Sequence, residues 1–275
     1  MTHSSHYRYA APVALGPHTL RLRPREEPVQ RLLAYSLRLD PQPAGSTQYV
    51  DQEGNSAVRV WFGAPTASLA IFSRFEVETL RTNPFDFLLE GPGTLQVPVV
   101  YPDALQPVLA PYTTAEASGE VAELARAAAQ EAGWRTMAFL TVLNERLFKS
   151  LRYVTRDAGW PLPAAQTLQA GQGSCRDFAQ VFVEACRQMR LAARFVSGYE
   201  IGAASAACPD MHAWAEVYLS GGGWRGYDPS RGLSVADSHV TVAASLSPEL
   251  ASPVTGTHSG SEDSRLETNI HLTAS

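Results

Sequence analysis

The chain has 275 residues, of which 45% are hydrophobic and 18% are charged, and its formal net charge is −5. This length and composition allow a sizeable buried core in one large domain or two ordinary ones, and they exclude extended disorder. The acidic balance argues against a nucleic-acid or anionic-membrane surface, and no apolar run approaches the roughly 18 residues of a membrane span.

The first part of the chain, to about residue 110, has the pattern of an antiparallel β domain. Apolar and polar residues alternate over 33–40, and the alternation continues over 58–62 and 69–78. The Glu-Gly-Asn run at 53–55 is typical of a hairpin turn, and prolines separate the strands. No catalytic constellation is found here, so we interpret residues 1–110 as a structural or substrate-docking domain.

Helical patterns begin in the second part, residues 111–275. A proline-rich connection over 101–112 leads to apolar positions at helical spacing over 118–131, and Gly133 is expected to end that helix. The next helix carries an apolar stripe that we predict to be core, formed by Met137, Leu140, Leu147, Phe148 and Leu151.

A third helical pattern begins at Cys175, directly after a glycine-containing segment that ends in Ser174. Ser174 is a plausible N-cap, and Asp177 lies in the first turn, where its charge suits the helix dipole. Unpaired N–H groups at a helix start favour an anion, the thiolate is the reactive form of cysteine, and the same groups can stabilise an oxyanion. Taken alone, Cys175 fits a small buried helix-start residue equally well. The predicted buried stripe of this helix is Phe178, Val181, Phe182, Ala185 and Met189.

His212 opens an alternating strand pattern over 212–219, and Asp228 ends a returning strand over 224–228 after a glycine-rich turn. Small and aliphatic residues fill the face opposite His212, which favours packing of that face on the helices. A loop with an odd number of residues puts His212 and Asp228 on one face, whereas an even loop separates them. A lone histidine on a strand or a lone Asp-Pro pair is more often structural, so the sequence makes a geometric prediction here.

Together the three residues can carry thiol-based acyl transfer. Cys175 would attack an acyl carbon as a thiolate, and His212 would form the ion pair and later protonate the leaving amine. Asp228 would hold the imidazole in the required tautomer and orientation. A zinc site built from the same residues is disfavoured because no second close-spaced ligand pair supports it. We therefore expect neither a metal nor a cofactor.

The remaining cysteines and two upstream side chains receive no catalytic role. Cys186 lies inside the third helix and is predicted to be core, and Cys208 precedes a proline in a loop as an exposed bystander. Trp160 and Gln169 lie upstream of Cys175 and are candidate hydrogen-bond donors to an oxyanion, but the sequence favours neither. Three cysteines without a metal-type pair, and an N-terminus without the apolar stretch of a signal peptide, favour reduced thiols and a cytoplasmic setting.

These motifs resemble the transglutaminase-like superfamily, which shares the papain-type cysteine-protease architecture, over roughly residues 135 to 243. The N-terminal part is similar to the β domain that precedes this module in a bacterial subgroup, through Pro12-Val13, residues 20–25 and Gly54-Asn55. The segments that carry the main resemblance are Gly173-Ser174-Cys175-Arg176-Asp177-Phe178-Ala179, Ala193-Arg194-Phe195-Val196-Ser197-Gly198-Tyr199, His212-Ala213-Trp214-Ala215-Glu216-Val217-Tyr218 and Gly223-Trp224-Arg225-Gly226-Tyr227-Asp228-Pro229-Ser230.

The resemblance implies an α+β fold, with an antiparallel β domain over 1–110 and a papain-like domain over 111–275 whose helices pack on an antiparallel sheet. It implies a triad of Cys175, His212 and Asp228 and a thioester intermediate. The implied partner is a peptide or protein amide, cleaved by water or passed to an amine acceptor, with no nucleic acid or membrane. Two alternatives are a peptide-binding module of the same fold without turnover and an acyltransferase that uses a thioester cofactor. Intact triad residues argue against the binding module.

Overall fold

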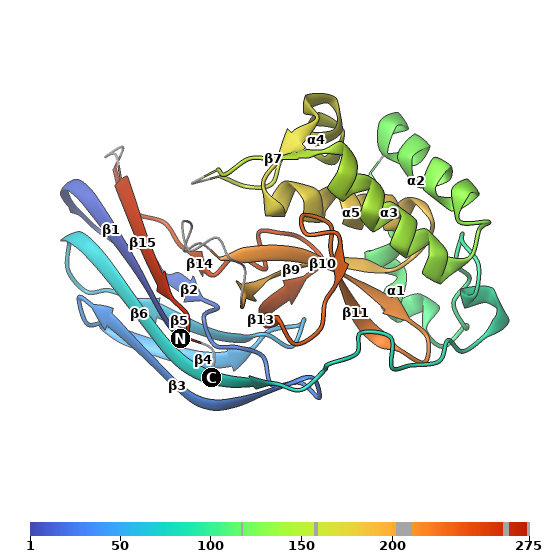
Figure 1. Cartoon of the computed structure of the whole chain (residues 1–275). Coiled ribbons are helices and arrows are strands. Elements are labelled where there is room, and N and C mark those ends of the chain that lie inside the picture. The colour runs from blue at the N-terminus through green and yellow to red at the C-terminus, as the bar shows by residue number, and fades with distance from the viewer. Residues whose placement is uncertain (117, 157–158, 202–210, 261–263, 274–275) are drawn as a thin grey trace.

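The structure is a computed structural model that describes residues 1–116, 118–156, 159–201, 211–260 and 264–273. Strands from both ends of the chain form a β domain, and the middle of the chain forms a second domain of helices and a sheet (Figure 1). The predicted α+β class and the N-terminal antiparallel β domain are thereby confirmed.

The β domain contains, among the described residues, two four-stranded antiparallel sheets with the orders β15-β1-β6-β3 and β14-β2-β5-β4. Apolar side chains of both sheets, among them Leu20, Val60 and Ile71, are buried together in one core. The predicted turn joins β4 to β5, where Gly54 has a φ of 81° that favours glycine. The strands of this domain are β1 (Thr2–Val13), β2 (His18–Leu20), β3 (Gln30–Asp40), β4 (Gly45–Val50), β5 (Ser56–Trp61), β6 (Thr66–Thr79), β14 (Val254–Thr255) and β15 (Ser264–His271).

The C-terminal strands belong to this first domain. β15 pairs antiparallel with β1 from Thr2 opposite His271 to Tyr9 opposite Ser264, and β14 pairs with β2. The partner of β15 is therefore the first strand of the chain. Both termini lie at the β domain in Figure 1, so the sheets do not follow a single division of the chain at residue 110.

The second domain has a five-stranded antiparallel sheet with the order β12-β11-β10-β9-β13 in the part of the chain that the structure describes. Ala215, Val217 and Leu219 of β10 share a buried core with the helices, which cover that face of the sheet as expected (Figure 1). The strands of this domain are β7 (Arg152–Tyr153), β8 (Gln172–Gly173), β9 (Ala193–Glu200), β10 (His212–Leu219), β11 (Gly223–Asp228), β12 (Leu233–Ser234) and β13 (His239–Ser245).

Helix boundaries follow the signals in the sequence. Ser118 caps α2 by accepting a hydrogen bond from the Val121 N–H, and Gly133, with a φ of 61°, follows the helix. The predicted stripe of α5 is buried between the sheet and the other helices. The helices are η1 (Pro92–Thr94), α1 (Gln106–Thr113), α2 (Gly119–Glu131), α3 (Thr136–Ser150), α4 (Ala164–Ala170) and α5 (Cys175–Gln188).

Two local expectations were wrong. The proline-rich connection forms α1, because Pro107 lies in its first turn, where no intrahelical N–H bond is lost, and Pro111 lies close to its end. Phe148, predicted to be core, is 50% exposed because the buried stripe of α3 runs through Leu143 and Leu147. The Phe148 ring instead lies beside Gly232, where an added Cβ would be 2.8 Å from the ring.

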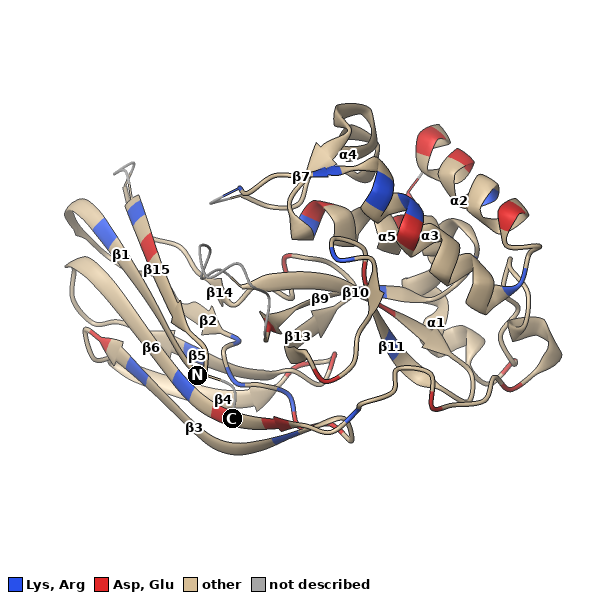
Figure 2. Ribbon diagram, viewed as in Figure 1, with Lys and Arg blue, Asp and Glu red and all other residues tan. Residues whose placement is uncertain are grey.

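The two domains share an apolar interface at the β13 end of the five-stranded sheet. Phe75 of β6 is buried there with Tyr199 of β9 and with Val240 and Val242 of β13. Lys and Arg are interspersed with Asp and Glu over both domains (Figure 2). Within the described ranges, every helix is too short or too polar to cross a bilayer.

Candidate active site

Cys175 is the first residue of α5, and its side chain is partly exposed. Asp177 in the first turn accepts hydrogen bonds from the Ser174 N–H and hydroxyl, both at 2.7 Å, so both residues have the predicted positions. The thiol packs beside Ala179 and Ala213. The sulfur is therefore at the positive end of a helix.

The start of α5 is held by further donors to the same buried carboxylate. Oδ1 of Asp177 accepts a hydrogen bond from Arg156 Nη2 at 2.7 Å and from the Leu162 N–H at 2.8 Å. The segment that precedes α4 is thus fastened to the helix that carries the thiol. Four donors on one buried carboxylate fix the first turn of α5.

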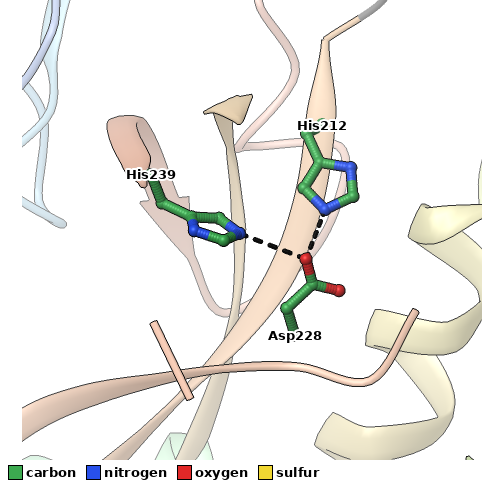
Figure 3. A group of neighbouring side chains, drawn as sticks. All are labelled: His212, Asp228 and His239. Carbon is green, nitrogen blue, oxygen red and sulfur yellow. Dashed lines mark hydrogen bonds and ion pairs between the residues drawn. The ribbon is translucent and has the colours of Figure 1, made fainter. Parts of the chain in front are cut away.

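His212 and Asp228 lie on the same face of the sheet. The loop between β10 and β11 has three residues, 220–222, and Ala215 pairs with Tyr227, which puts Asp228 diagonal to His212. His212 Nε2 donates to Asp228 Oδ2 at 2.6 Å, and both side chains are buried (Figure 3). Of the two alternatives that the sequence left open, the loop with an odd number of residues is therefore the one present.

The imidazole of His212 connects the thiol to the carboxylate. The Cys175 thiol lies close to the His212 side chain and to the backbone of Ala213, and both lower its pKa. Since Nε2 of His212 is engaged by Asp228, Nδ1 is the nitrogen left for the sulfur. The structure therefore brings together all three residues that the sequence singled out.

Electrostatics in this group favour a thiolate and an imidazolium. Burial raises the pKa of Cys175, but the hydrogen bond and positive charge of His212 outweigh it, and the pKa lies below the ordinary value. Burial lowers the pKa of His212, but the charge and hydrogen bond of Asp228, followed by those of Cys175, raise it well above the ordinary value. The buried ion pair is thus stabilised by a second negative group behind the ring.

Asp228 is itself held firmly. Its Oδ1 accepts hydrogen bonds from the Ser230 hydroxyl at 2.8 Å, the Ser230 N–H at 3.0 Å and the Arg231 N–H at 3.2 Å. Burial raises the pKa of Asp228, but the charges and hydrogen bonds of His212 and His239 keep it well below the ordinary value. The Asp-Pro pair therefore makes a turn and also orients a histidine.

Sequence reasoning missed His239, the first residue of β13. Its ring is buried, and its Nε2 lies 3.1 Å from the same Asp228 oxygen that binds His212 (Figure 3). The ligand atoms of the three residues lie within 4.8 Å of one another, as in a metal site, but each already has a hydrogen-bond partner in the group. The only signal in the sequence is a histidine at the start of this strand, all of whose residues are buried in the structure.

The other candidates lie apart from this group. Cys186 is fully buried, as predicted, and burial raises its pKa well above the ordinary value. Cys208 lies outside the described residues. Gln169 donates to Glu120 of α2 at 2.9 Å, and Trp160 is exposed, with its carbonyl accepting from an arginine. The structure assigns neither of them to an oxyanion.

Comparison with known families defines the class of protein. The transglutaminase-like superfamily matches residues 120–229, which include all three site residues, and the bacterial transglutaminase-like N-terminal region matches residues 1–78. The chain is thus similar to the transglutaminase-like superfamily in its second domain and to the N-terminal region of bacterial members in its first.

Individual relatives cover nearly the whole chain. It is 24% identical to an uncharacterized protein of Mycobacterium leprae over 99% of this chain and 97% of that protein. It is 25% identical to an uncharacterized protein of Mycobacterium tuberculosis over 99% of this chain and 91% of that one. The crystal structure of a candidate cysteine protease from Cytophaga hutchinsonii has the same fold, with a TM-score of 0.72 and 22% identity over 99% of this chain and 90% of its own.

Proposed function

We propose that the protein is a cysteine-dependent acyl-transfer enzyme that acts on peptide-type amides through a thioester at Cys175. The observation that supports this most is the position of the His212 imidazole, which donates to Asp228 at 2.6 Å and lies close enough to Cys175 to lower the pKa of the thiol. A binding role has no need for a cysteine whose pKa is lowered by an adjacent histidine.

In the first half-reaction, the Cys175 thiolate attacks the carbonyl carbon of the amide and forms a C–S bond. The N–H groups at the start of α5 are suited to stabilise the developing oxyanion. The His212 imidazolium gives its proton to the departing nitrogen, so the C–N bond breaks and an amine leaves. The product on the protein is a thioester, and His212 is left neutral.

In the second half-reaction, neutral His212 takes a proton from water or from an amine while that molecule attacks the thioester. The C–S bond breaks, and a carboxylic acid or a new amide is released with the thiolate–imidazolium pair restored. The choice between hydrolysis and transamidation depends on how well the bound acyl group excludes water. The partners we propose are a peptide or protein amide and, for transamidation, an amine. A reactive thiol suits a reducing compartment, and we propose the cytoplasm.

The first experiment measures alkylation of Cys175 by substoichiometric iodoacetamide from pH 5 to 10, with the labelled cysteine identified by mass spectrometry. We expect Cys175 to be labelled at a pH well below the ordinary thiol pKa of about 8.5. His212→Ala should return the profile to that of an ordinary thiol, and buried Cys186 should stay unlabelled in both proteins. An ordinary Cys175 profile that His212→Ala leaves unchanged would rule out the proposal.

The second experiment measures turnover. Incubation with a peptide library, with and without an added amine, should give cleaved or amine-linked products with the wild type and none with Cys175→Ala. An electrophilic peptide should form a covalent adduct at Cys175. Peptide retention without product or adduct would instead identify a binding module.

A further inference from the structure

The Asp228 carboxylate receives a second histidine that the proposed chemistry does not use. His239 Nε2 lies 3.1 Å from Oδ2, and His239 Nδ1 lies 2.9 Å from the Ser238 hydroxyl. An ionised carboxylate can only accept, so Nε2 of His239 carries a proton and donates to Oδ2, while Nδ1 is hydrogen-bonded to the Ser238 hydroxyl. His239 and His212 thus meet the same carboxylate oxygen, Oδ2, from different strands (Figure 3).

The strand that carries His239 is held from outside by the β domain. β13 is the end strand of the described sheet, and two buried side-chain amides cover its outer edge. Gln30 donates to the Thr241 carbonyl at 2.8 Å and accepts from the Thr241 N–H at 2.9 Å. Asn55 donates to the Ala244 carbonyl at 2.8 Å and accepts from the Ala244 N–H at 2.9 Å. Each amide therefore replaces a peptide group of a neighbouring strand.

We propose that His239 is a positioning residue for the Cys175–His212–Asp228 group and that the amide clamp, Gln30 and Asn55, lets the β domain hold it in place. This inference rests on the proposed function. It assigns to the N-terminal domain a part in assembling the site, in addition to any role in docking substrate.

The position of the clamp explains why it is needed. β13 pairs in register with β9 from His239 to Thr241, but the register shifts between Thr241 and Ala243, so the clamp adds contacts to β13 on both sides of the shift. Gln30 binds both backbone groups of Thr241, two residues from His239, and Asn55 binds beyond the irregularity. An unpaired edge at this point would leave polar groups free and the strand less constrained.

The physical effect is on orientation. The turn residues hold Oδ1 of Asp228, while the two histidines converge on Oδ2. Without His239 one of the partners of Oδ2 is lost, and the carboxylate is less constrained where it meets His212. Loss of an orienting partner of this kind typically costs about 10-fold to 100-fold in function, as outer-shell changes do at metal sites.

The test compares Cys175 alkylation profiles and melting temperatures of four variants. His239→Leu removes the donor and should lower the alkylation rate at pH 6 about tenfold or more, whereas His239→Gln keeps an N–H and should retain most of it. Gln30→Leu should lower the rate in the same direction. Ser73→Ala is the matched control, because it removes a buried β-domain hydrogen bond, to the Leu22 carbonyl, that does not reach β13. It should lower the melting temperature and leave the profile unchanged.

The inference is overturned if His239→Leu has the wild-type alkylation profile. It is also overturned if Gln30→Leu and Ser73→Ala have the same alkylation profile as each other. If the variants do not fold, nitrogen-15 NMR of the wild-type histidines decides. A protonated Nε2 of His239 supports the inference, and an unprotonated Nε2 overturns it. An ordinary Cys175 thiol in the wild type refutes the proposed function itself, whereas a reactive thiol that is indifferent to His239 refutes this inference alone.

Discussion

Asp228 uses its two carboxylate oxygens for different tasks. Oδ1 closes the turn that follows β11, and Oδ2 receives the two histidines. The division keeps the carboxylate rigid, because a rotation that frees Oδ2 would also break the turn. A residue type that is common in turns therefore becomes an orienting group when tertiary structure brings a histidine to its second oxygen.

Replacing Asp228 by Asn tests this division. The amide has no negative charge and presents a donor where two histidines donate, so His212 loses the partner that fixes its tautomer. We expect turnover to fall on the order of 10²-fold to 10⁴-fold. Because Asp228 raises the pKa of His212, the imidazolium of the variant should lose its proton at a lower pH. The alkaline limb of its pH–rate profile should therefore lie at a lower pH than that of the wild type.

The measurement is a pH–rate profile with a peptide identified by the library experiment. Asp86→Asn is the control, since Asp86 forms an exposed ion pair with Arg225 and lies apart from the group. An alkaline limb that does not move in Asp228→Asn would show that His212 is not the proton donor.

At the scale of elements, Gly198 allows three strands to meet at the site. It pairs with His212 of β10 on one side and with Thr241 of β13 on the other. A Cβ at this position would lie 2.1 Å from the Val240 carbonyl oxygen and 2.6 Å from the Trp214 ring. That indole packs against the His239 imidazole, with ring centroids 5.0 Å apart. The missing side chain thus lets the indole and both histidine strands pack closely.

We expect Gly198→Ala to destabilise the protein by about 1–3 kcal/mol, because the added methyl meets backbone that cannot yield easily. It should also slow alkylation of Cys175, since the strand that carries His212 must shift. Gly119→Ala in α2 is the matched control, because nothing lies within 4 Å of its Cβ position. Alanine there should raise the free energy of unfolding by about 0.5–1 kcal/mol. Urea unfolding measures both changes, and equal stability of the two variants would contradict this explanation.

At the scale of the whole molecule, the N-terminal strand joins the two domains. His3 of β1 is buried against Tyr199 of β9, with Nδ1 2.6 Å from the phenol oxygen and Nε2 2.9 Å from the Ser5 hydroxyl. These neighbours are neutral, and burial lowers the pKa of His3 to about 4. The interface therefore contains an uncharged histidine that must stay uncharged for the domains to remain packed.

This histidine predicts a pH dependence of stability. Between about pH 6.5 and pH 4 the unfolded chain protonates His3 while the folded protein does not, so the free energy of unfolding falls as the pH falls. The full difference in pKa corresponds to about 3 kcal/mol. His3→Gln should remove this part of the decline, as measured by urea unfolding at pH 7, 5 and 4. An identical fall in the free energy of unfolding in the wild type and in His3→Gln would contradict this role of His3.

Local pattern was enough to locate the three residues of the proposed triad. Helical spacing and an N-cap placed Cys175 at a helix start, and strand alternation with an odd turn put His212 and Asp228 on one face. These features depend on backbone geometry within a few residues, so they can be predicted from a single sequence. The exposed Phe148 was predicted incorrectly because helical spacing gives the period of a stripe but not its width.

Contacts between distant segments were decided by tertiary structure alone. The sequence by itself determined the fold class and the three residues of the proposed triad, but not that β15 pairs with β1. Nor did it indicate that His239 shares a carboxylate with His212, or that Gln30 and Asn55 cover the edge of β13. The reason is physical: amides and imidazoles bind whichever polar group packing brings to them, and no local period specifies a partner far away in the chain.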